Sequence, residues 1–339
     1  MNAPKRRLSQ LGEFGWLKQL LPRLYWPTSL NPHLCIGAGD DAGVLRITPG
    51  RVLVMTTDAL VEGVHFERRW FSPRDLGEKL LAINLSDLAA MGKVKPTAVV
   101  ITAALPGDTP VDSVDKFYQG LKSCAQRWKV GFLGGDTIGS RKGWFVSATL
   151  MGEAKPNELI RRKGARAGDL LAVIGPLGLA AAGLEVLQTG RKGAGWTRPL
   201  VDAFSRPQPM LDVGAILGSQ GWATSMMDVS DGLEASVCLL SEASQVGVGV
   251  ELDEYPIPSP LKRWASFRRR DPKAYVLKGG EDYALIFTVP PAKWSKVQGR
   301  IPGVRRIGRV YPASQGCWAS WGRKKVKLSS YGYAHFKNR

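Results

Sequence analysis

The chain has 339 residues, a length that favours two domains. Of these residues 44% are hydrophobic and 22% are charged, a composition typical of a globular protein. Its formal net charge of +18 favours anionic ligands such as nucleic acid, acidic lipid or phosphorylated small molecules. No recognised nucleic-acid-binding motif accompanies the basic residues, so we do not expect a role in nucleic-acid binding. No apolar stretch approaches the roughly 18–20 residues of a membrane span, and polar residues interrupt the basic start of the chain, unlike a signal peptide. We therefore predict a cytoplasmic protein without a membrane segment.

The four cysteines are Cys35, Cys124, Cys238 and Cys317. None lies near another in sequence, so the chain has no cysteine spacing of the zinc-binding type. Scattered single cysteines suit a reducing compartment better than a disulfide framework. We expect all four to be small buried hydrophobic residues.

In the first half of the chain, predicted strands and helices alternate. Ser72 and Pro73 indicate the start of a helix, because Ser is a favoured N-cap and Pro suits the first helical position; Gly92 is a natural end for it. A second helix is predicted from Pro110 to about Lys129. The predicted strands are 52–57, 97–104, 130–133 and 144–152.

A stretch containing Pro, Gly and many basic residues follows at 154–168, and we place a domain boundary at its start, between 1–153 and 154–339. Strands and helices alternate again beyond it. The predicted strands are 170–174, 223–228 and 282–289, and the predicted helices are 179–188 and 232–244. We expect a loop at 189–209, which is polar and contains Gly and Pro, and short strands and turns from 304 onward. Each half is therefore predicted to be α+β.

The acidic residues gather in short segments rich in Gly, Ser and Thr, most of which directly follow a predicted strand. The segments are GDD at 39–41, TTD at 56–58, NLSD at 84–87, GGDT at 134–137, DVSDG at 228–232 and GGED at 279–282. Mg²⁺ prefers hard oxygen ligands, usually a few carboxylates together with substrate phosphates and water. Clustered carboxylates and phosphates repel one another unless cations lie between them. The pattern therefore predicts several Mg²⁺ ions and a phosphate-bearing ligand.

Each segment also has a plain structural interpretation. Ser86, Ser230 and Asp231 could cap helices, and Gly135 with Asp136 could form a simple turn. The recurrence of such segments at predicted strand ends favours a shared ligand site. The sequence contains no P-loop and no protein-kinase signature set. With three histidines in the whole chain, a histidine metal centre is not expected.

The segments also carry a family resemblance, which extends over almost the whole chain. They are GEF at 12–14, GDDAGVL at 39–45, TTDALVEGVHF at 56–66, LAINLSDLAAMG at 81–92, GGDT at 134–137, RRKGARAGD at 161–169, MDVSDGL at 227–233, GGEDYALIF at 279–287 and YGYAHF at 331–336. In sequence and order they resemble the thiamine-monophosphate kinase family, within the aminoimidazole ribonucleotide synthetase-like superfamily. Ala59 and Ala284 depart from the common family pattern, but neither has an expected role.

The resemblance implies a two-domain α+β fold of the aminoimidazole ribonucleotide synthetase type. The N-terminal domain, 1–153, would bind ATP and Mg²⁺ and would form a sheet-built barrel with a second copy in a homodimer. The C-terminal domain, 154–339, would be an α/β sandwich-like domain that completes the ATP and substrate site.

The resemblance also implies roles for individual residues. The expected Mg²⁺ ligands are Asp41, Thr56, Thr57, Asp58, Asp87, Asp136, Asp228 and Asp231. The expected ATP contacts are Gly135, Asp136, Arg162 and Ser230. The expected thiamine monophosphate contacts are His65, Glu281 and Tyr333. Asp87, bridging several ions, and Arg162, pairing with the nucleotide phosphates, are the expected catalytic residues. Without the resemblance, His65 could equally be a satisfied core histidine, and Tyr333 would be simple packing.

The implied activity is ATP-dependent phosphorylation of thiamine monophosphate to thiamine diphosphate. The acceptor is a phosphate monoester with a second pKa of about 6, so it is largely dianionic near neutral pH and needs no catalytic base. Direct in-line transfer would then depend on positioning and charge neutralisation. Two alternatives stay open. One is a sister ATP-dependent enzyme acting on another phosphate or amide, and the other is a basic nucleic-acid-binding protein that has lost catalysis.

Overall fold

The computed structural model describes residues 7, 10, 19–20, 22–23, 33–36, 44–190, 195–253 and 255–328. The predictions for Asp41, for Tyr333 and for the segments 12–14 and 331–336 therefore lie outside the described residues. The chain divides into two compact units. Unit 1 comprises Met1–Leu88 and Val94–Pro156, and unit 2 comprises Ala89–Lys93 and Asn157–Arg339. No helix within the described ranges is long and apolar enough to cross a lipid bilayer.

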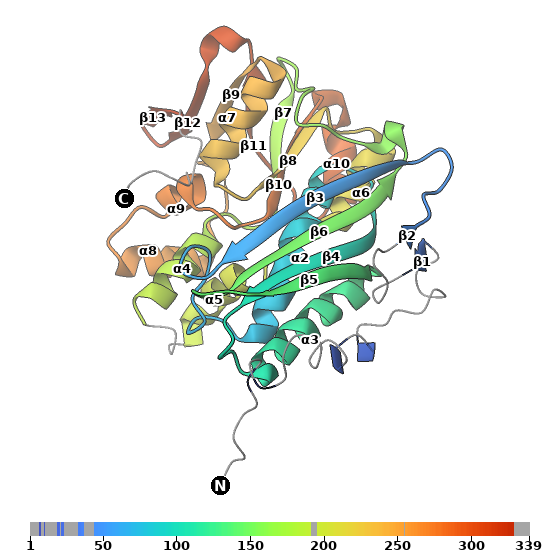
Figure 1. Ribbon diagram of the computed structural model, residues 1–339. Coiled ribbons are helices and arrows are strands. Elements are labelled where there is room, and N and C mark those ends of the chain that lie inside the picture. Colours follow the sequence, from blue (N-terminus) through green and yellow to red (C-terminus); the bar gives the residue numbers. More distant parts are fainter. Residues whose placement is uncertain are drawn as a thin grey trace. The chain divides into compact units, whose positions relative to one another are not determined.

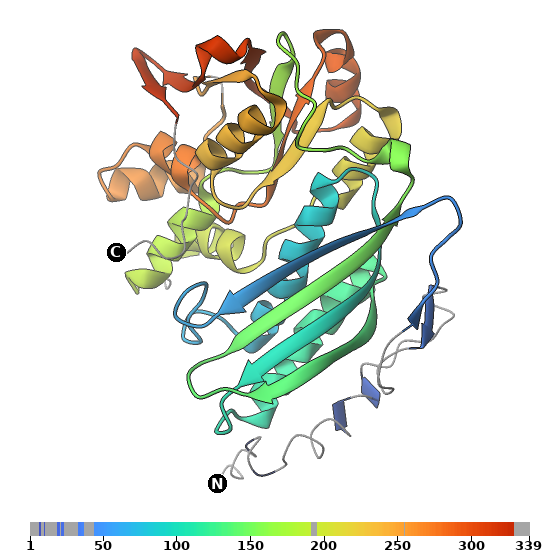
Figure 2. The same ribbon diagram turned by 45° about the horizontal axis from the view of Figure 1, so that its top comes forward.

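Among the described residues of unit 1, the main sheet has four strands in the order β3-β6-β4-β5 (Figure 1). They are β3 Val52–Val61, β4 Lys95–Leu105, β5 Gly131–Gly139 and β6 Phe145–Ala154. A small separate ribbon pairs β1 Leu34–Ile36 with β2 Val44–Leu45. Only the β4–β5 pairing in the main sheet is parallel. Helices α2 Pro73–Ala90 and α3 Val111–Trp128 cover one face of this sheet (Figure 2).

The predicted start of α2 is confirmed in detail. The Ser72 hydroxyl accepts a hydrogen bond from the Asp75 amide at 3.1 Å, which satisfies one of the amides that a helix start leaves unpaired.

Two glycines allow α2 to approach α3 closely. A Cβ on Gly77 would lie 2.0 Å from the Phe117 carbonyl oxygen, and a Cβ on Gly120 would lie 2.0 Å from the Arg74 carbonyl oxygen. Glycine is therefore required at both positions by the packing of the two helices.

Among the described residues of unit 2, the sheet has seven strands in the order β13-β12-β9-β11-β7-β10-β8. They are β7 Leu170–Ile174, β8 Ser225–Val229, β9 Gly247–Glu251, β10 Ala284–Val289, β11 Arg305–Tyr311, β12 Cys317–Trp321 and β13 Lys324–Lys327. The helices are α4 Leu179–Gln188, α5 Arg198–Ser205, α6 Leu211–Gln220, α7 Leu233–Ser244, α8 Ser259–Phe267, α9 Pro272–Lys278 and α10 Trp294–Arg300. Strands β7 and β8 both run antiparallel to β10, so their carboxyl ends lie beside its amino end.

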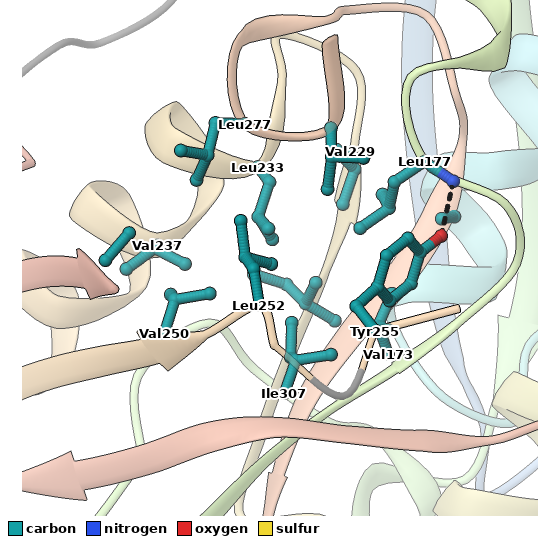
Figure 3. Packing of buried hydrophobic residues seen from close by; sticks show 14 of the residues in the cluster. Val173, Leu177, Val229, Leu233, Val237, Val250, Leu252, Tyr255, Leu277 and Ile307 are labelled. Carbon is teal, nitrogen blue, oxygen red and sulfur yellow. Dashed lines mark hydrogen bonds between the residues drawn. The ribbon is translucent and has the colours of Figure 1, made fainter. Parts of the chain in front are cut away.

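The core of unit 2 joins one face of this sheet to the helices that cover it. Val173, Val229 and Val250 of the sheet meet Leu233 and Leu277 of α7 and α9 (Figure 3). Figure 3 also shows one polar contact in this core, in which the Tyr255 hydroxyl accepts a hydrogen bond from the Leu177 amide at 2.8 Å. Burial raises the pKa of Tyr255 to about 12, so the hydroxyl stays protonated at physiological pH.

The predicted loop at 189–209 is wrong, because residues 198–205 form α5. Pro199 lies in the first turn, where its missing N–H costs no hydrogen bond, and Leu200 and Phe204 are one helical turn apart and buried. A Cβ on Gly183 of α4 would lie 2.0 Å from the Leu200 carbonyl oxygen. The helix therefore depends on a close approach to α4 that composition alone does not reveal.

The cysteine prediction is confirmed only for Cys124, which is buried, whereas Cys35 is exposed. Cys238 of α7 and Cys317 of β12 are partly buried and hydrogen-bonded to each other. That hydrogen bond, together with bonds from Ser241 and the Val248 amide, lowers the pKa of Cys317 to about 6, although burial acts in the opposite direction. The shared hydrogen bond and burial raise the pKa of Cys238. The two thiols therefore form a polar contact at the rim of the core.

Gly183→Ala is expected to lower the free energy of unfolding by about 2–3 kcal/mol, because the new methyl group meets a backbone carbonyl that cannot move independently. Gly299 of α10 is the matched control, since a Cβ there meets nothing within 4 Å. Gly299→Ala should raise the same quantity by about 0.5–1 kcal/mol through helix propensity. Urea unfolding of both variants measures the difference, and equal stabilities would contradict the packing argument.

Candidate active site

Within unit 1, strand β3 and helix α2 bring Thr56 and Asp87 together. The Thr56 hydroxyl donates a hydrogen bond to the Asp87 carboxylate at 2.5 Å. Asp58 lies on the same face of β3 as Thr56, because alternate residues of a strand share a face. Asn84, three residues before Asp87 on α2, is fully buried; its side-chain oxygen has no hydrogen-bond partner among the described residues. Thr56 and Asp87 therefore bring two oxygen ligands together between the sheet and α2, and Asp58 and Asn84 carry further oxygen atoms on the same strand face and the same helix.

Two other predicted residues of unit 1 lie on the opposite face of this sheet. Thr57 is exposed, and its hydroxyl bonds with Thr149 and with the Ala148 carbonyl oxygen, both at 3.1 Å. Thr137 of β5 hydrogen-bonds with Tyr118 of α3, so the adjacent Asp136 points away from the helices. The side chains of Thr57 and Asp136 are therefore not brought to the same face as that of Asp87.

Gly135 has a structural requirement of its own. A Cβ on it would lie 2.1 Å from the Ile101 carbonyl oxygen of the neighbouring strand β4. Both Gly135 and Asp136 are exposed and lie within β5, so the GGDT segment is part of a strand. The TTD segment likewise lies inside β3, and the NLSD segment lies inside α2. The expectation that such segments mark strand ends is therefore wrong for GGDT and TTD, whereas NLSD lies in the helix that the sequence predicted.

His65 closes a short turn at the end of β3. Its ring nitrogen Nδ1 accepts a hydrogen bond from the Val61 amide at 3.0 Å, and its own amide donates to the Val61 carbonyl oxygen at 2.9 Å. Because Nδ1 is an acceptor, the proton of the neutral ring is on Nε2. The side chain is partly exposed, so the turn fixes the orientation of a histidine that a ligand can reach.

Within unit 2, four of the predicted site residues lie where β8 ends and β10 begins. Asp228 is buried near the end of β8, and Ser230 and Asp231 follow that strand. The Glu281 amide donates a hydrogen bond to the Ser230 carbonyl oxygen at 2.6 Å, so the DVSDG and GGED segments are in direct contact. The structure therefore brings Asp228, Ser230, Asp231 and Glu281 to one end of the unit 2 sheet.

Arg162 lies at the other end of that sheet. The Arg161 carbonyl oxygen accepts a hydrogen bond from the Met226 amide near the start of β8, and the Arg162 carbonyl oxygen accepts one from the Ser244 hydroxyl. Met226 and Ser230 are four positions apart, or about 13 Å at roughly 3.3 Å per residue. The structure thus does not bring the exposed Arg162 close to the other predicted residues of unit 2.

Asp282 was not assigned a role from the sequence, yet it joins the GGED segment to α4. Its carboxylate accepts hydrogen bonds from the amides of Gly178 and Ala180, at 2.6 and 3.2 Å. The signal that could have found it is the GPLGLA turn at 175–180, whose glycines place two amides at a helix start.

The described residues contain no group of three or more His, Cys, Asp or Glu side chains placed to hold a metal ion by themselves. A Mg²⁺ ion ordinarily takes one or two carboxylates and completes its shell with water and substrate phosphates. Thr56 with Asp87, and Asp228 with Asp231, offer only oxygen atoms as ligands, so their chemistry fits this mode of Mg²⁺ binding.

Comparison with known proteins agrees with these features. The family model "AIR synthase related protein, N-terminal domain" matches residues 39–154, and the model "AIR synthase related protein, C-terminal domain" matches residues 166–315. A thiamine-monophosphate kinase of Mycobacterium tuberculosis is 35% identical over 324 residues, which are 93% of this chain and 93% of that protein.

Two solved structures resemble the chain over most of its length. The thiamine-monophosphate kinase of Stenotrophomonas maltophilia K279a has a TM-score of 0.79 at 31% identity, and the match covers 91% of this chain and 96% of that one. AaThiL complexed with AMPPCP and TMP has a TM-score of 0.77 at 30% identity, and the match covers 98% of this chain and 100% of that one. The chain therefore has the two-domain α+β fold of the AIR synthase related proteins, and it belongs to the thiamine-monophosphate kinase family.

Proposed function

We propose that the chain is a kinase that transfers the γ-phosphoryl group of ATP to thiamine monophosphate, releasing thiamine diphosphate and ADP. The observation that carries this proposal is its likeness, over nearly the full length of both chains, to AaThiL complexed with AMPPCP and TMP. The family's curated members support the same activity. The enzyme is thus a phosphotransferase whose acceptor is a phosphate group.

Mg²⁺ is the proposed cofactor. When bound, it would neutralise the charge of the ATP phosphates and of the developing transition state. Asp87 with Thr56, and Asp228 with Asp231, are the pairs of residues that would hold it. Asp41, Thr57, Asp58 and Asp136 remain proposed ligands as well. The hydroxyl of Thr57 lies on the opposite face of β3 from that of Thr56, so the two side chains would not serve the same ion directly.

The chain's own residues would act by binding and orienting the two substrates. Thiamine monophosphate is already a nucleophile near neutral pH, so no residue needs to remove a proton from it. His65, Glu281 and Tyr333 are the proposed contacts for thiamine monophosphate. Gly135, Asp136, Arg162 and Ser230 are the proposed contacts for ATP. In-line transfer would follow from this positioning, without a covalent enzyme intermediate.

A homodimer is proposed through the face of the unit 1 sheet opposite α2 and α3; among the described residues, Leu45 packs against part of this face, at Ala98 and Met151. Several large apolar side chains on or near that face are exposed, with Met55 at 59%, Ile138 at 50%, Leu53 at 40% and Phe145 at 38% exposure. Exposed apolar side chains on a sheet face are typical of a protein–protein interface. A second copy would cover them and complete the proposed sheet-built barrel. Analytical ultracentrifugation should give twice the chain mass of 36.9 kDa, and a monomer at micromolar concentration would contradict the dimer.

The two parts of the chain are assigned complementary tasks. Residues 1–153 are proposed to bind ATP and Mg²⁺ and to form the dimer, and residues 154–339, an α/β sandwich-like domain, are proposed to complete the ATP and substrate site. A cytoplasmic location is proposed because the described cysteines are all free thiols.

Arg162→Ala is expected to raise the KM for ATP by about tenfold while leaving the KM for thiamine monophosphate unchanged, because it would remove a charge-assisted contact with a nucleotide phosphate. Lys163→Ala is the matched control, since Lys163 is the next residue and is also exposed. Steady-state kinetics with each substrate varied in turn make the comparison. An equal effect of both substitutions would mean that Arg162 acts only through the net positive charge of the protein.

The function itself is tested by ADP production from ATP and Mg²⁺. We expect activity with thiamine monophosphate and none with free thiamine, which lacks the acceptor phosphate. Activity only with a different phosphate or amide would favour the sister-enzyme alternative. A protein that neither binds nor hydrolyses ATP, but binds nucleic acid in a salt-dependent manner, would favour the alternative of a nucleic-acid-binding protein that has lost catalysis.

A further inference from the structure

Three segments of unit 2 meet at one end of its sheet. Residues 175–178 follow β7, residues 230–232 follow β8, and residues 279–283 lead into β10. Strands β7 and β8 flank β10 and run antiparallel to it, so the register places Ile174 and Asp228 opposite Leu285. The GGED segment therefore lies between the other two, and it can be held from both sides.

Asp282 holds this segment to the 175–180 side. Its Oδ2 accepts a hydrogen bond from the Gly178 amide at 2.6 Å, and its Oδ1 accepts one from the Ala180 amide at 3.2 Å. These amides belong to the start of α4, where unpaired N–H groups attract an acceptor of negative charge. Enclosure of the carboxyl group nevertheless raises the pKa of Asp282 to about 8, while the two amides act in the opposite direction and Glu281 adds to the rise.

The residues on either side of Asp282 are held to the 228–232 side in an unusual backbone conformation. Glu281 has φ of 65° and Tyr283 has φ of 50°, in the left-handed region that non-glycine residues rarely adopt. The Glu281 amide bonds with the Ser230 carbonyl oxygen at 2.6 Å, and the Tyr283 amide bonds with the Val229 carbonyl oxygen at 2.9 Å. A strained conformation of this kind persists only where surrounding contacts hold it.

Close backbone packing leaves the segment little room to shift. A Cβ on Gly280 would lie 2.8 Å from the Ser230 carbonyl oxygen. Gly178 has φ of 81°, and a Cβ on it would lie 2.8 Å from the Tyr275 carbonyl carbon. A change at Asp282 would therefore be transmitted to Glu281 and to Ser230 instead of being absorbed locally.

A simpler interpretation is that Asp282 is an ordinary helix cap, of which Asp271 is an example in the same unit. Asp271 directly precedes α9, and its carboxylate accepts a hydrogen bond from the Lys273 amide at 2.9 Å. Asp282, in contrast, is 104 positions away in sequence from its partner Gly178 at the start of α4, and it lies between two residues with strained backbone conformations. Its contact joins distant segments and does more than satisfy a helix end.

We propose that Asp282 is a positioning residue, which fixes the backbone of Glu281 and Ser230 by joining the GGED segment to the start of α4. It would thereby set the geometry of one contact with thiamine monophosphate and one with ATP. The inference rests on the proposed function, because the roles of Glu281 and Ser230 come from there. Asp282 itself touches neither substrate.

The test compares Asp282→Asn with Asp271→Asn, a cap substitution that spares the three segments. We expect Asp282→Asn to lower kcat/KM for thiamine monophosphate by about tenfold to a hundredfold, at a temperature where both variants are folded. Asp271→Asn should leave kcat/KM unchanged, because the asparagine side-chain oxygen can still accept the hydrogen bond from the Lys273 amide and cap α9. If Asp282→Asn does not fold, Asp282→Ser, which keeps one acceptor oxygen, takes its place. Wild-type kinetics in the folded Asp282 variant would overturn the proposal.

Hydrogen exchange provides a readout that does not depend on activity. The amides of Glu281 and Tyr283 should exchange faster in Asp282→Asn than in the wild type, and they should be unaffected in Asp271→Asn. Unchanged exchange at both amides would overturn the proposal even if activity fell. If the wild-type protein does not phosphorylate thiamine monophosphate, the proposed function fails, and faster exchange still supports the positioning of Glu281 by Asp282.

Discussion

Asp87→Asn is expected to lower kcat by about two to three orders of magnitude without a loss of stability. The substitution keeps the size of the side chain and removes its negative charge. Asparagine can still accept the hydrogen bond that Thr56 donates at 2.5 Å, so the contact between β3 and α2 is retained. The neighbouring Leu85 and Leu88 are fully buried and unchanged, so α2 keeps its packing. Steady-state kinetics at saturating Mg²⁺ and ATP measure the effect.

Asp112→Asn is the matched control for this experiment. Asp112 also lies on a helix of unit 1, but its side chain is 50% exposed and forms an ion pair with Lys116 at 2.7 Å. An exposed pair of this kind contributes little to stability. We expect kcat to be unchanged in this variant. Turnover in Asp87→Asn close to that of the wild type would contradict the proposed role of Asp87.

Glu185→Gln is expected to lower the free energy of unfolding by about 2–3 kcal/mol. The Glu185 carboxylate of α4 accepts hydrogen bonds from Trp264 Nε1 at 2.8 Å and Arg268 Nε at 2.9 Å, and from the Tyr275 hydroxyl. Arg270 adds an ion pair at 3.3 Å. The Glu185 side chain is 14% exposed, so glutamine would lose the charge-assisted hydrogen bonds of a largely enclosed carboxylate, although Arg268 and Arg270 are themselves 33% and 57% exposed. Urea unfolding at pH 7 measures the loss.

The same interaction has a predictable pH dependence. Burial alone would raise the pKa of Glu185, but the bonds from Tyr275 and Trp264 and the charges of Arg268 and Arg270 hold that pKa below its ordinary value of 4.5. A lowered pKa in the folded state adds stability above the ordinary value, and this stability is lost as the pH falls through the folded-state pKa. The difference between wild type and Glu185→Gln should therefore be constant from pH 7 to about pH 5 and shrink below about pH 4.5.

Glu242→Gln is the control for the stability experiment. Glu242 lies on α7 of the same unit, and its side chain is exposed. We expect the free energy of unfolding at pH 7 to change by no more than about 0.5 kcal/mol. A loss equal to that of Glu185→Gln would mean that net charge, and not the enclosed network, determines stability.

Helices and strands with clear local signals were predictable from the sequence. The strand at 170–174 and the helix at 179–188 have the bounds that the pattern indicated. Helix α5 was missed, because its stability depends on the close contact between Gly183 and Leu200, which are apart in sequence. The predicted strand at 282–289 begins at Ala284 instead, because Glu281 and Tyr283 adopt left-handed conformations that no pattern of hydrophobicity reports.

The candidate site was predictable in its residues more than in their arrangement. The acidic segments indicated the chemistry, because oxygen ligands and glycine are recognisable in a sequence. Their placement was not, because it depends on strand register: Thr56 and Thr57 point to opposite faces, and Arg162 and Ser230 lie at opposite ends of β8. Asp282 escaped notice for the same reason, since its partners are amides of a distant helix start.

Transfer of the γ-phosphoryl group can be followed by product analysis with ATP that carries ¹⁸O in that group. The protein is incubated with this ATP, Mg²⁺ and thiamine monophosphate, and the products are identified by mass spectrometry. We expect thiamine diphosphate labelled in its terminal phosphoryl group, together with unlabelled ADP. Label recovered in inorganic phosphate, without thiamine diphosphate, from a folded protein that binds ATP would contradict phosphoryl transfer to thiamine monophosphate.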